Sequence, residues 1–186
     1  MFLSQRLARL ALSLIGWRCM DFEGRPERAV LVGYPHTSNW DFPLTLLALK
    51  ALGLNARWVG KDALFRGPLG PVMRWLGGIP INRRERTGFV ERVAAMLRDE
   101  PPFLLAIAPE GTRSLTAGWK TGFYRIAGSA DLPIVLGTID YSQRRVGLLG
   151  SLKPSGEESA DMAAIAACYE GVRGRRPELA SPIRLI

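Results

Sequence analysis

Residues 29–41, AVLVGYPHTSNWD, form the stretch that decides the fold. The stretch begins with Ala29-Val30-Leu31-Val32, a continuous apolar run of the kind that makes a short buried strand. Beyond Asp41, Pro43 precedes the apolar-rich segment from Leu44 to Leu49, where we expect a helix because proline suits a first helical turn. The stretch therefore predicts a strand, a turn and a helix in succession.

His36 is the only histidine in 186 residues, and it stands just after this strand. Positions i and i+5 of one helix point about 140° apart, so His36 and Asp41 can face one spot only if a loop joins them. We therefore place Asp41 in or just before the first helical turn, where the helix dipole stabilises a carboxylate. Asp41 can then accept one imidazole N–H and leave the other nitrogen as a base near neutral pH. A base with no protein nucleophile points to a substrate hydroxyl or amine, and the alternative is a purely structural histidine.

Apolar runs with helical segments between them recur along the rest of the chain. We expect further strands over residues 55–59, 77–81, 103–107, 132–139 and 145–149, and helices over 44–53, 89–98 and 160–172 with a short interrupted pair in 63–76. This alternation predicts an α/β fold, a single-domain mainly parallel sheet with helices on both faces. Ligands of such sheets bind beyond the carboxyl ends of the strands. Three polar clusters fall there, namely His36 to Asp41, Asn82 to Arg86 and Glu110 to Ser114. We expect the last residues, 171–186, to form a loosely packed tail.

The amino terminus combines apolar residues at helical spacing with basic residues among them. We expect an amphipathic helix within residues 1–20 and the catalytic domain in residues 21–186. The helix either covers the core of the domain or rests on a membrane interface with its arginines towards anionic headgroups. A signal peptide is disfavoured because Gly16-Trp17-Arg18-Cys19 is a poor cleavage site. The sequence contains no uninterrupted run of 18 or more apolar residues, so it does not predict a transmembrane helix.

The composition favours anionic partners. The net charge is +8, from 25 lysines and arginines against 17 acidic residues, which suits nucleic acid, acidic lipid, phosphorylated substrates or an acidic carrier protein. With one histidine and two cysteines, a zinc site built from those residue types is disfavoured. We interpret Cys19 and Cys168 as reduced, which fits a cytosolic setting.

A second polar motif, Pro109-Glu110-Gly111-Thr112-Arg113-Ser114, follows the expected strand 103–107. A guanidinium can bind two phosphate oxygens at once, and backbone N–H groups beside a flexible glycine can add to the site. Glu110 could orient Arg113 or bind a substrate hydroxyl. Alone, the motif could be a surface turn with a salt bridge, but its combination with His36 and Asp41 argues against a chance occurrence.

With these two motifs, the sequence resembles a known family, the glycerolipid acyltransferases typified by 1-acylglycerol-3-phosphate (lysophosphatidic acid) acyltransferase. The resemblance extends from about Ala29 to Ile139 and consists of four blocks in the order of the family. They are His36-x4-Asp41, Lys61 through Pro68 and Gly70 to Arg83, Glu110-Gly111-Thr112-Arg113-Ser114, and Leu132-Pro133-Ile134-Val135. The third block is the most specific.

The resemblance implies that His36, oriented by Asp41, is the general base. It would deprotonate an acceptor hydroxyl, which attacks the acyl thioester of coenzyme A or acyl carrier protein, without an acyl-enzyme, a metal or a further cofactor. The substrate-binding residues implied in the same way are Lys61, Arg83, Glu110, Gly111, Thr112, Arg113 and Ser114.

Two positions depart from the family pattern. Pro35 stands where the family usually has asparagine, and Ala108 stands where it usually has an aromatic residue. The expected acceptor is of the lysophospholipid type, and an amino-lipid or glycolipid is the alternative.

The expected partners are the acyl-CoA or acyl-carrier protein donor, the lysolipid acceptor and a membrane surface, without nucleic acid. The expected location is cytoplasmic, peripheral on the cytoplasmic face of the membrane.

Three other readings compete with this one. A nucleic-acid-binding module could use the arginine-rich stretch 83–98, but no aromatic platform interleaves with it. A serine hydrolase could use Ser38 or Ser114, but the chain has no G-x-S-x-G elbow. A non-catalytic lipid-binding relative is the third alternative, and the presence of both His36 and Asp41 counts against it.

Overall fold

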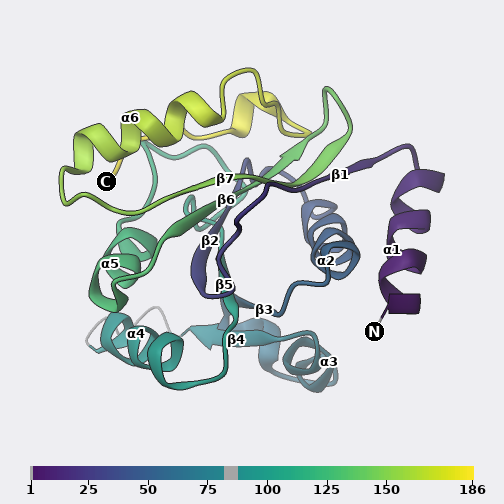
Figure 1. The fold of residues 1–186 in the computed structure, drawn as a ribbon, viewed down its shortest axis with the longest axis horizontal. Helices are drawn as coiled ribbons and strands as arrows, with labels where there is room; N and C mark the ends of the chain where they lie inside the picture. Colours follow the sequence, from purple (N-terminus) through teal and green to yellow (C-terminus); the bar gives the residue numbers. More distant parts are fainter. Residues whose placement is uncertain (1, 82–87) are drawn as a thin grey trace.

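A computed structural model describes residues 2–81 and 88–186. These residues form a seven-stranded sheet in the order β1-β7-β6-β2-β5-β3-β4 (Figure 1). Strands β6 and β7 pair antiparallel, and all other neighbouring strands pair parallel, so the sheet is mainly parallel as the sequence predicts. The strands are β1 (Arg18–Met20), β2 (Ala29–Tyr34), β3 (Ala56–Lys61), β4 (Gly78–Ile81), β5 (Leu104–Ile107), β6 (Ile134–Asp140) and β7 (Arg145–Leu152).

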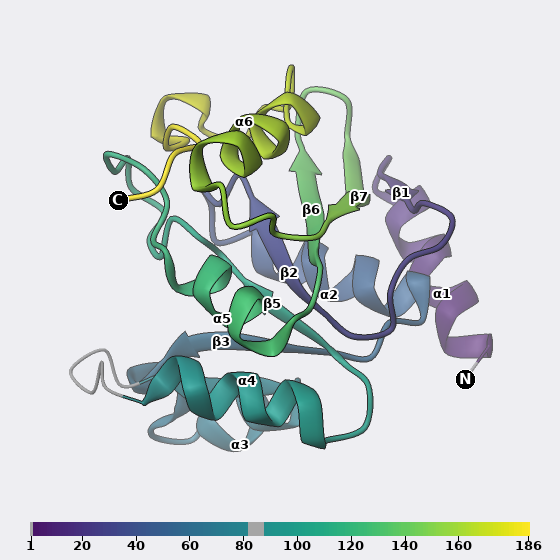
Figure 2. The same cartoon turned by 60° about the vertical axis from the view of Figure 1, so that its left-hand side comes forward.

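Helices cover both faces of this sheet. Helices α1 and α2 lie on one face, and α4, α5 and α6 lie on the other, as the two views in Figures 1 and 2 show. The α-helices are α1 (Phe2–Leu14), α2 (Asp41–Leu52), α3 (Gly70–Trp75), α4 (Phe89–Asp99), α5 (Gly122–Ala130) and α6 (Glu158–Cys168), and the 3-10 helices are η1 (Asp62–Phe65) and η2 (Pro177–Leu179). Helix α5 is absent from the sequence-based expectation. Its Gly122, Gly128 and Ser129 lower the helix propensity of a segment whose apolar residues nevertheless recur at helical spacing.

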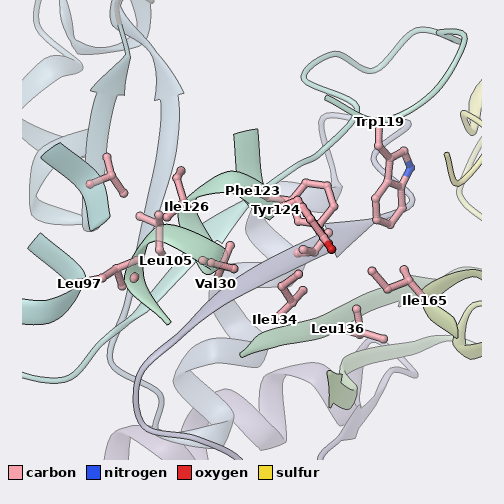
Figure 3. Close-up of a cluster of buried hydrophobic side chains, with 14 of the residues drawn as sticks. Val30, Leu97, Leu105, Trp119, Phe123, Tyr124, Ile126, Ile134, Leu136 and Ile165 are labelled. Carbon is pink, nitrogen blue, oxygen red and sulfur yellow. The ribbon is translucent and has the colours of Figure 1, made fainter. Parts of the chain in front are cut away.

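The central strand β2 divides its side chains between the two faces. Val30 and Val32 join the core under α4, α5 and α6, whereas Ala29 and Leu31 join the core on the α2 side. This alternation is the period of two expected for a strand, and both sets are buried because helices cover both faces. Figure 3 shows the larger core, in which Trp119 and residues of α5 pack over the sheet.

Helix α1 packs on α2 through Ala8 and Leu12, which are buried. Leu7, Leu10 and Leu14 lie on the same helix and are exposed. The helix ends at Leu14, and Arg18–Met20 instead form the edge strand β1, so the amphipathic helix is shorter than the expected segment 1–20. Within the described ranges, every helix is too short or too polar to cross a membrane.

The parallel strands bring their carboxyl ends to one edge of the sheet. Strands β2, β3, β5 and β6 end there at Tyr34, Lys61, Ile107 and Asp140. Strand β4 ends at the same edge, but the polar cluster after it, including Arg83, lies outside the described residues. The carboxyl edge is therefore where the polar motifs of the sequence come together.

Candidate active site

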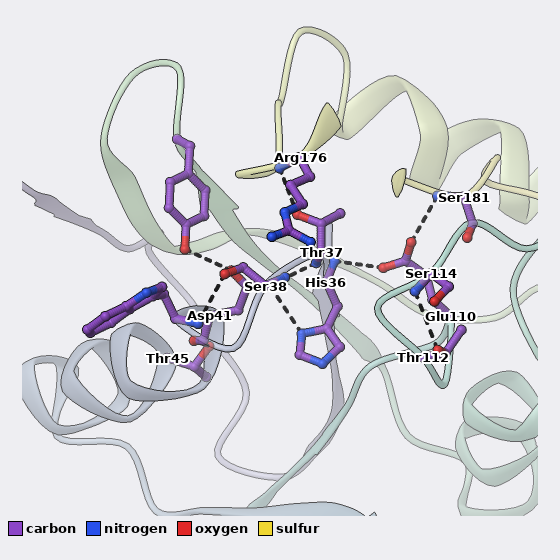
Figure 4. A network of polar contacts seen from close by, with 12 residues as sticks. His36, Thr37, Ser38, Asp41, Thr45, Glu110, Thr112, Ser114, Arg176 and Ser181 are labelled. Carbon is purple, nitrogen blue, oxygen red and sulfur yellow. Dashed lines mark hydrogen bonds and ion pairs between the residues drawn. The ribbon is translucent and has the colours of Figure 1, made fainter. Parts of the chain in front are cut away.

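His36 and Asp41 lie between the end of β2 and the start of α2 (Figure 4). Imidazole Nδ1 of His36 lies 3.3 Å from Oδ2 of Asp41. The side chain of Asp41 is only 1% exposed, whereas that of His36 is 28% exposed. Asp41 is the first residue of α2, where the positive end of the helix dipole favours its negative charge. A buried acid thus holds one nitrogen of a partly open imidazole and leaves Nε2 for a ligand.

Asp41 receives hydrogen bonds from three further donors. The backbone N–H groups of Thr37 and Ser38 both donate to Oδ2 at 2.8 Å, so the carboxylate fixes the turn that carries His36. The phenol of Tyr141 donates to Oδ1, also at 2.8 Å. Because charge-assisted hydrogen bonds of this kind are the stronger ones, they offset the cost of burying the carboxylate.

Tyr141 follows β6, and the sequence-based list of site residues lacks it. Burial and the hydrogen bond to Asp41 raise the pKa of Tyr141 well above its ordinary value, so its phenol remains a donor at neutral pH. Its ring packs edge-on against Trp17, with the ring centres 5.0 Å apart. The only sequence signal for this residue was its position directly after a strand at the carboxyl edge.

Glu110 is completely buried behind His36, with an exposed fraction of 0%. Its Oε2 accepts the backbone N–H of His36 at 2.7 Å, and its Oε1 accepts the backbone N–H of Ser181 at 2.9 Å. Burial raises the pKa of Glu110, and these two amide hydrogen bonds offset part of that rise. Both oxygens are therefore engaged by backbone groups, and we interpret Glu110 as a positioning residue rather than a substrate contact or a partner of Arg113.

The carboxyl-terminal segment, which was expected to be a loose tail, is tied to this site. The phenol of Tyr34 donates to the carbonyl of Ser181 at 3.1 Å, and the Thr116 hydroxyl donates to the Ser181 hydroxyl at 2.8 Å. The N–H of Arg176 donates to the hydroxyl of Thr37 at 3.2 Å. The expectation was wrong because these contacts join residues far apart in sequence, and local composition carries no signal for them.

A cavity of about 950 Å³ opens beside His36. One part is apolar and lies between α2 and the sheet, where Leu46, Leu49 and Leu52 of α2 face Leu31 and Leu148 of the strands. At Gly33 of β2 a side chain would meet open space, so the missing side chain leaves room in the cavity. The other part is polar and surrounds the mouth, with Lys61, Thr112, Arg113, Lys120 and Arg125 among its lining residues.

Four of the sequence-predicted binding residues line this cavity, namely Lys61, Gly111, Thr112 and Arg113. Glu110 and Ser114 belong to the same loop, but neither of them lines the cavity. Lys120 was missed by the sequence-based reading because it follows the motif by several residues. In the part of the chain that the structure describes, Arg113 forms no ion pair with a carboxylate.

Comparison with family models decides which family this arrangement belongs to. Residues 19–138 match the model of a family described as Acyltransferase. The chain belongs to this glycerolipid acyltransferase family. The matched region of this acyltransferase carries every residue of the His36–Asp41 and Glu110–Ser114 motifs. A search of curated proteins returned no match.

Two residues that support the candidate site lie outside the region that matches the family. Tyr141 and Ser181 lie beyond residue 138, outside the matched region. Both nevertheless reach the motif residues by hydrogen bonds, Tyr141 through Asp41 and Ser181 through Glu110. The candidate site therefore combines the family motifs with support from the final quarter of the chain.

Proposed function

We propose that the protein transfers a fatty acyl chain from an acyl thioester, acyl-CoA or acyl-carrier protein, to the free hydroxyl of a lysophospholipid-type acceptor. The observation that carries this proposal is the imidazole of His36, held by buried Asp41 at the junction of an apolar cavity and its basic mouth. Such a base can act on a substrate hydroxyl without a nucleophile from the protein.

In the proposed step, Nε2 of His36 takes the proton of the acceptor hydroxyl as its oxygen bonds to the thioester carbonyl carbon. The carbon–sulfur bond then breaks, and the leaving thiolate takes the proton from the imidazolium. The negative charge of Asp41 stabilises the imidazolium between these events. Bond making, bond breaking and proton transfer balance with no further cofactor and no acyl-enzyme.

The two parts of the cavity suit the two parts of the substrates. The apolar part, between α2 and the sheet, has the chemistry to accommodate a fatty acyl chain. Lys61 and Arg113 at the mouth have the chemistry to bind a phosphate, Arg113 through two hydrogen bonds at once. Arg83 remains part of the proposed acceptor site on the family resemblance alone.

We further propose that the protein works on the cytoplasmic face of a membrane. Helix α1 buries Ala8 and Leu12 against α2 and still exposes Leu7, Leu10 and Leu14. An apolar helical face with basic residues beside it is typical of helices that rest in a lipid interface. The net charge of +8 adds attraction to an anionic leaflet.

Thiol release by the purified protein tests the reaction. The protein is mixed with acyl-CoA or acyl-carrier protein, alone and with a panel of lysophospholipids, amino-lipids and glycolipids. We expect release that depends on the acceptor, together with an acylated product found by mass spectrometry. Acceptor-independent hydrolysis would indicate a thioesterase. The absence of thiol release with both donors and every acceptor would contradict the proposed activity.

A further inference from the structure

An apolar patch lies on η1 and α3, apart from α1. We define it by four exposed side chains, Leu64, Leu69, Val72 and Trp75, which are 49%, 64%, 45% and 83% exposed. Helix α3 lies at the lower edge of the molecule in both views of the ribbon (Figures 1 and 2). Among the side chains that the structure describes, Trp75 is the most exposed large apolar one. Large apolar patches on a protein surface commonly mark an interaction site.

The patch is exposed although its segment is tightly held. On the inner side, Phe65 is buried and stacks on Trp58 with the ring centres 5.5 Å apart. The Trp58 indole N–H donates to the carbonyl of Leu76 at 2.9 Å. A side chain at Gly70 would come within 2.3 Å of the Phe65 carbonyl, so the close approach of α3 to η1 requires glycine there. The fold thus fixes this segment and presents the patch outward.

The charges around the patch are mostly positive, with one acidic residue, Asp62 of η1, which forms an ion pair with Arg66 at 2.6 Å. Arg66 is therefore partly neutralised, whereas the ion pairs of the described residues include none for Arg74. Arg74 donates to the Phe65 carbonyl at 3.1 Å, which keeps its guanidinium beside the patch. Exposed leucine and tryptophan beside Arg74, on a chain with a net charge of +8, match the chemistry of an anionic lipid interface, where the indole ring sits at headgroup level.

The patch also continues into the cavity. Leu64 belongs to the patch and at the same time lines the cavity, and Lys61 lines the cavity one turn earlier in the chain. His36 lines the same cavity. Leu64 therefore joins the patch to the cavity that His36 lines.

We propose that the patch on η1 and α3 docks on an anionic lipid surface and sets the cavity mouth against it. The docking itself is independent of catalysis, and the delivery of a lipid substrate through Leu64 rests on the proposed function. Helix α1 is then a second, separate contact rather than the sole one.

Co-sedimentation with vesicles tests the docking in the absence of substrate. The vesicles contain phosphatidylcholine with or without phosphatidylglycerol, and the variants are Leu69→Ser with Trp75→Ser against the matched control Leu115→Ser. Leu115 is 58% exposed and lies outside the patch. We expect the double variant to lose at least about tenfold in binding to the anionic vesicles, since burying one such side chain is worth a tenfold change or more. We expect the control to bind like the wild type.

Tryptophan fluorescence with brominated lipids provides a second readout. We expect the wild type to be quenched by anionic vesicles, and the conservative Trp75→Phe variant to bind them while losing part of that quenching. Equal vesicle binding by the wild type and the folded double variant would overturn the docking. So would a dimer in solution that the double variant dissociates without any change in vesicle binding, because the patch would then be an interface between two copies.

The two proposals fail in different ways. If the wild type shows no thiol release but the patch variants lose vesicle binding, the docking stands and the proposed reaction fails. If the wild type is active and the patch variants act equally well on vesicle-bound and water-soluble short-chain acceptors, with unchanged vesicle binding, the docking fails alone.

Discussion

The two functional regions of the cavity, the His36–Asp41 pair and the basic mouth, are held in opposite ways. Asp41 is buried and accepts hydrogen bonds from Thr37, Ser38 and Tyr141 in addition to its contact with His36. At the mouth, the side chains of Lys61 and Arg113 are exposed. A base works best when its position is fixed before the substrate arrives, whereas flexible cations can adjust to an anionic group. Substitutions in the first region should therefore act on kcat and those in the second on KM.

The largest effect is expected from His36→Ala. General bases contribute roughly a hundredfold to ten-thousandfold, so we expect kcat to fall by about a thousandfold in the thiol-release assay. The imidazole is partly exposed, and among the described residues its ring is held by Asp41, so the thermal midpoint should change little. Near-normal kcat in a folded His36→Ala protein would remove the assigned base.

Asp41→Ala is the control for this prediction. Because Asp41 acts through His36, adding Asp41→Ala to His36→Ala should cost little further activity. The thermal midpoint of Asp41→Ala should fall, since the buried N–H groups of Thr37 and Ser38 lose their acceptor. Additive losses of activity in the double variant would instead give Asp41 a role separate from His36.

The next effect is expected from Arg113→Ala, which probes the other region. A hydrogen bond from a charged group is worth about 1.5–3 kcal/mol, so KM for the phosphate-bearing acceptor should rise about tenfold or more. We expect kcat to change much less, because in the proposed reaction Arg113 binds the phosphate of the acceptor and takes no part in the proton transfer. A fall in kcat at constant KM would blur the distinction between the two regions.

Glu110→Gln tests the positioning of His36. The substituted amide can accept only one of the two N–H groups that Glu110 binds, from His36 and Ser181, and it turns a donor towards the other. We expect a loss of about 1–3 kcal/mol in the free energy of unfolding and a fall of about tenfold in kcat. Urea denaturation and steady-state kinetics measure the two effects. A rise in KM with unchanged kcat would instead indicate that Glu110 contacts the substrate.

Tyr141→Phe should have the smallest effect and a diagnostic pH dependence. Loss of the phenol leaves more of the negative charge of Asp41 to stabilise the imidazolium of His36. Because the imidazolium cannot accept a proton, the acidic limb of the kcat/KM profile should move to higher pH, with a few-fold loss of activity near neutral pH. Packing against Trp17 is kept, but the buried carboxylate of Asp41 loses one hydrogen bond, so the thermal midpoint should also fall. An unshifted profile would make Tyr141 merely structural.

The first half of the site could be predicted from the sequence because it is local. The apolar run of β2, the polar turn and the proline near the start of α2 require His36 and Asp41 to lie at a strand–helix junction. The same logic places Gly111, Thr112 and Arg113 after β5. Parallel pairing then brings both segments to one edge of the sheet.

The supporting contacts could not be predicted because they are remote in sequence. Tyr141 is 100 residues from Asp41, and Ser181 is 71 residues from Glu110. Neither contact follows from periodicity or from a motif. The burial of Glu110 could not be predicted for the same reason, since a buried carboxylate and a solvent-facing one look identical in sequence.

The central claim is that the acceptor hydroxyl attacks the thioester directly, with His36 as base and no covalent intermediate. The intact mass of the protein, quenched at intervals during turnover with acyl-CoA and acceptor, tests this claim most directly. Direct transfer predicts an unmodified mass at every interval while free thiol accumulates. An increase by the mass of one acyl group, formed and lost at the rate of turnover, would contradict it and indicate a nucleophile in the protein.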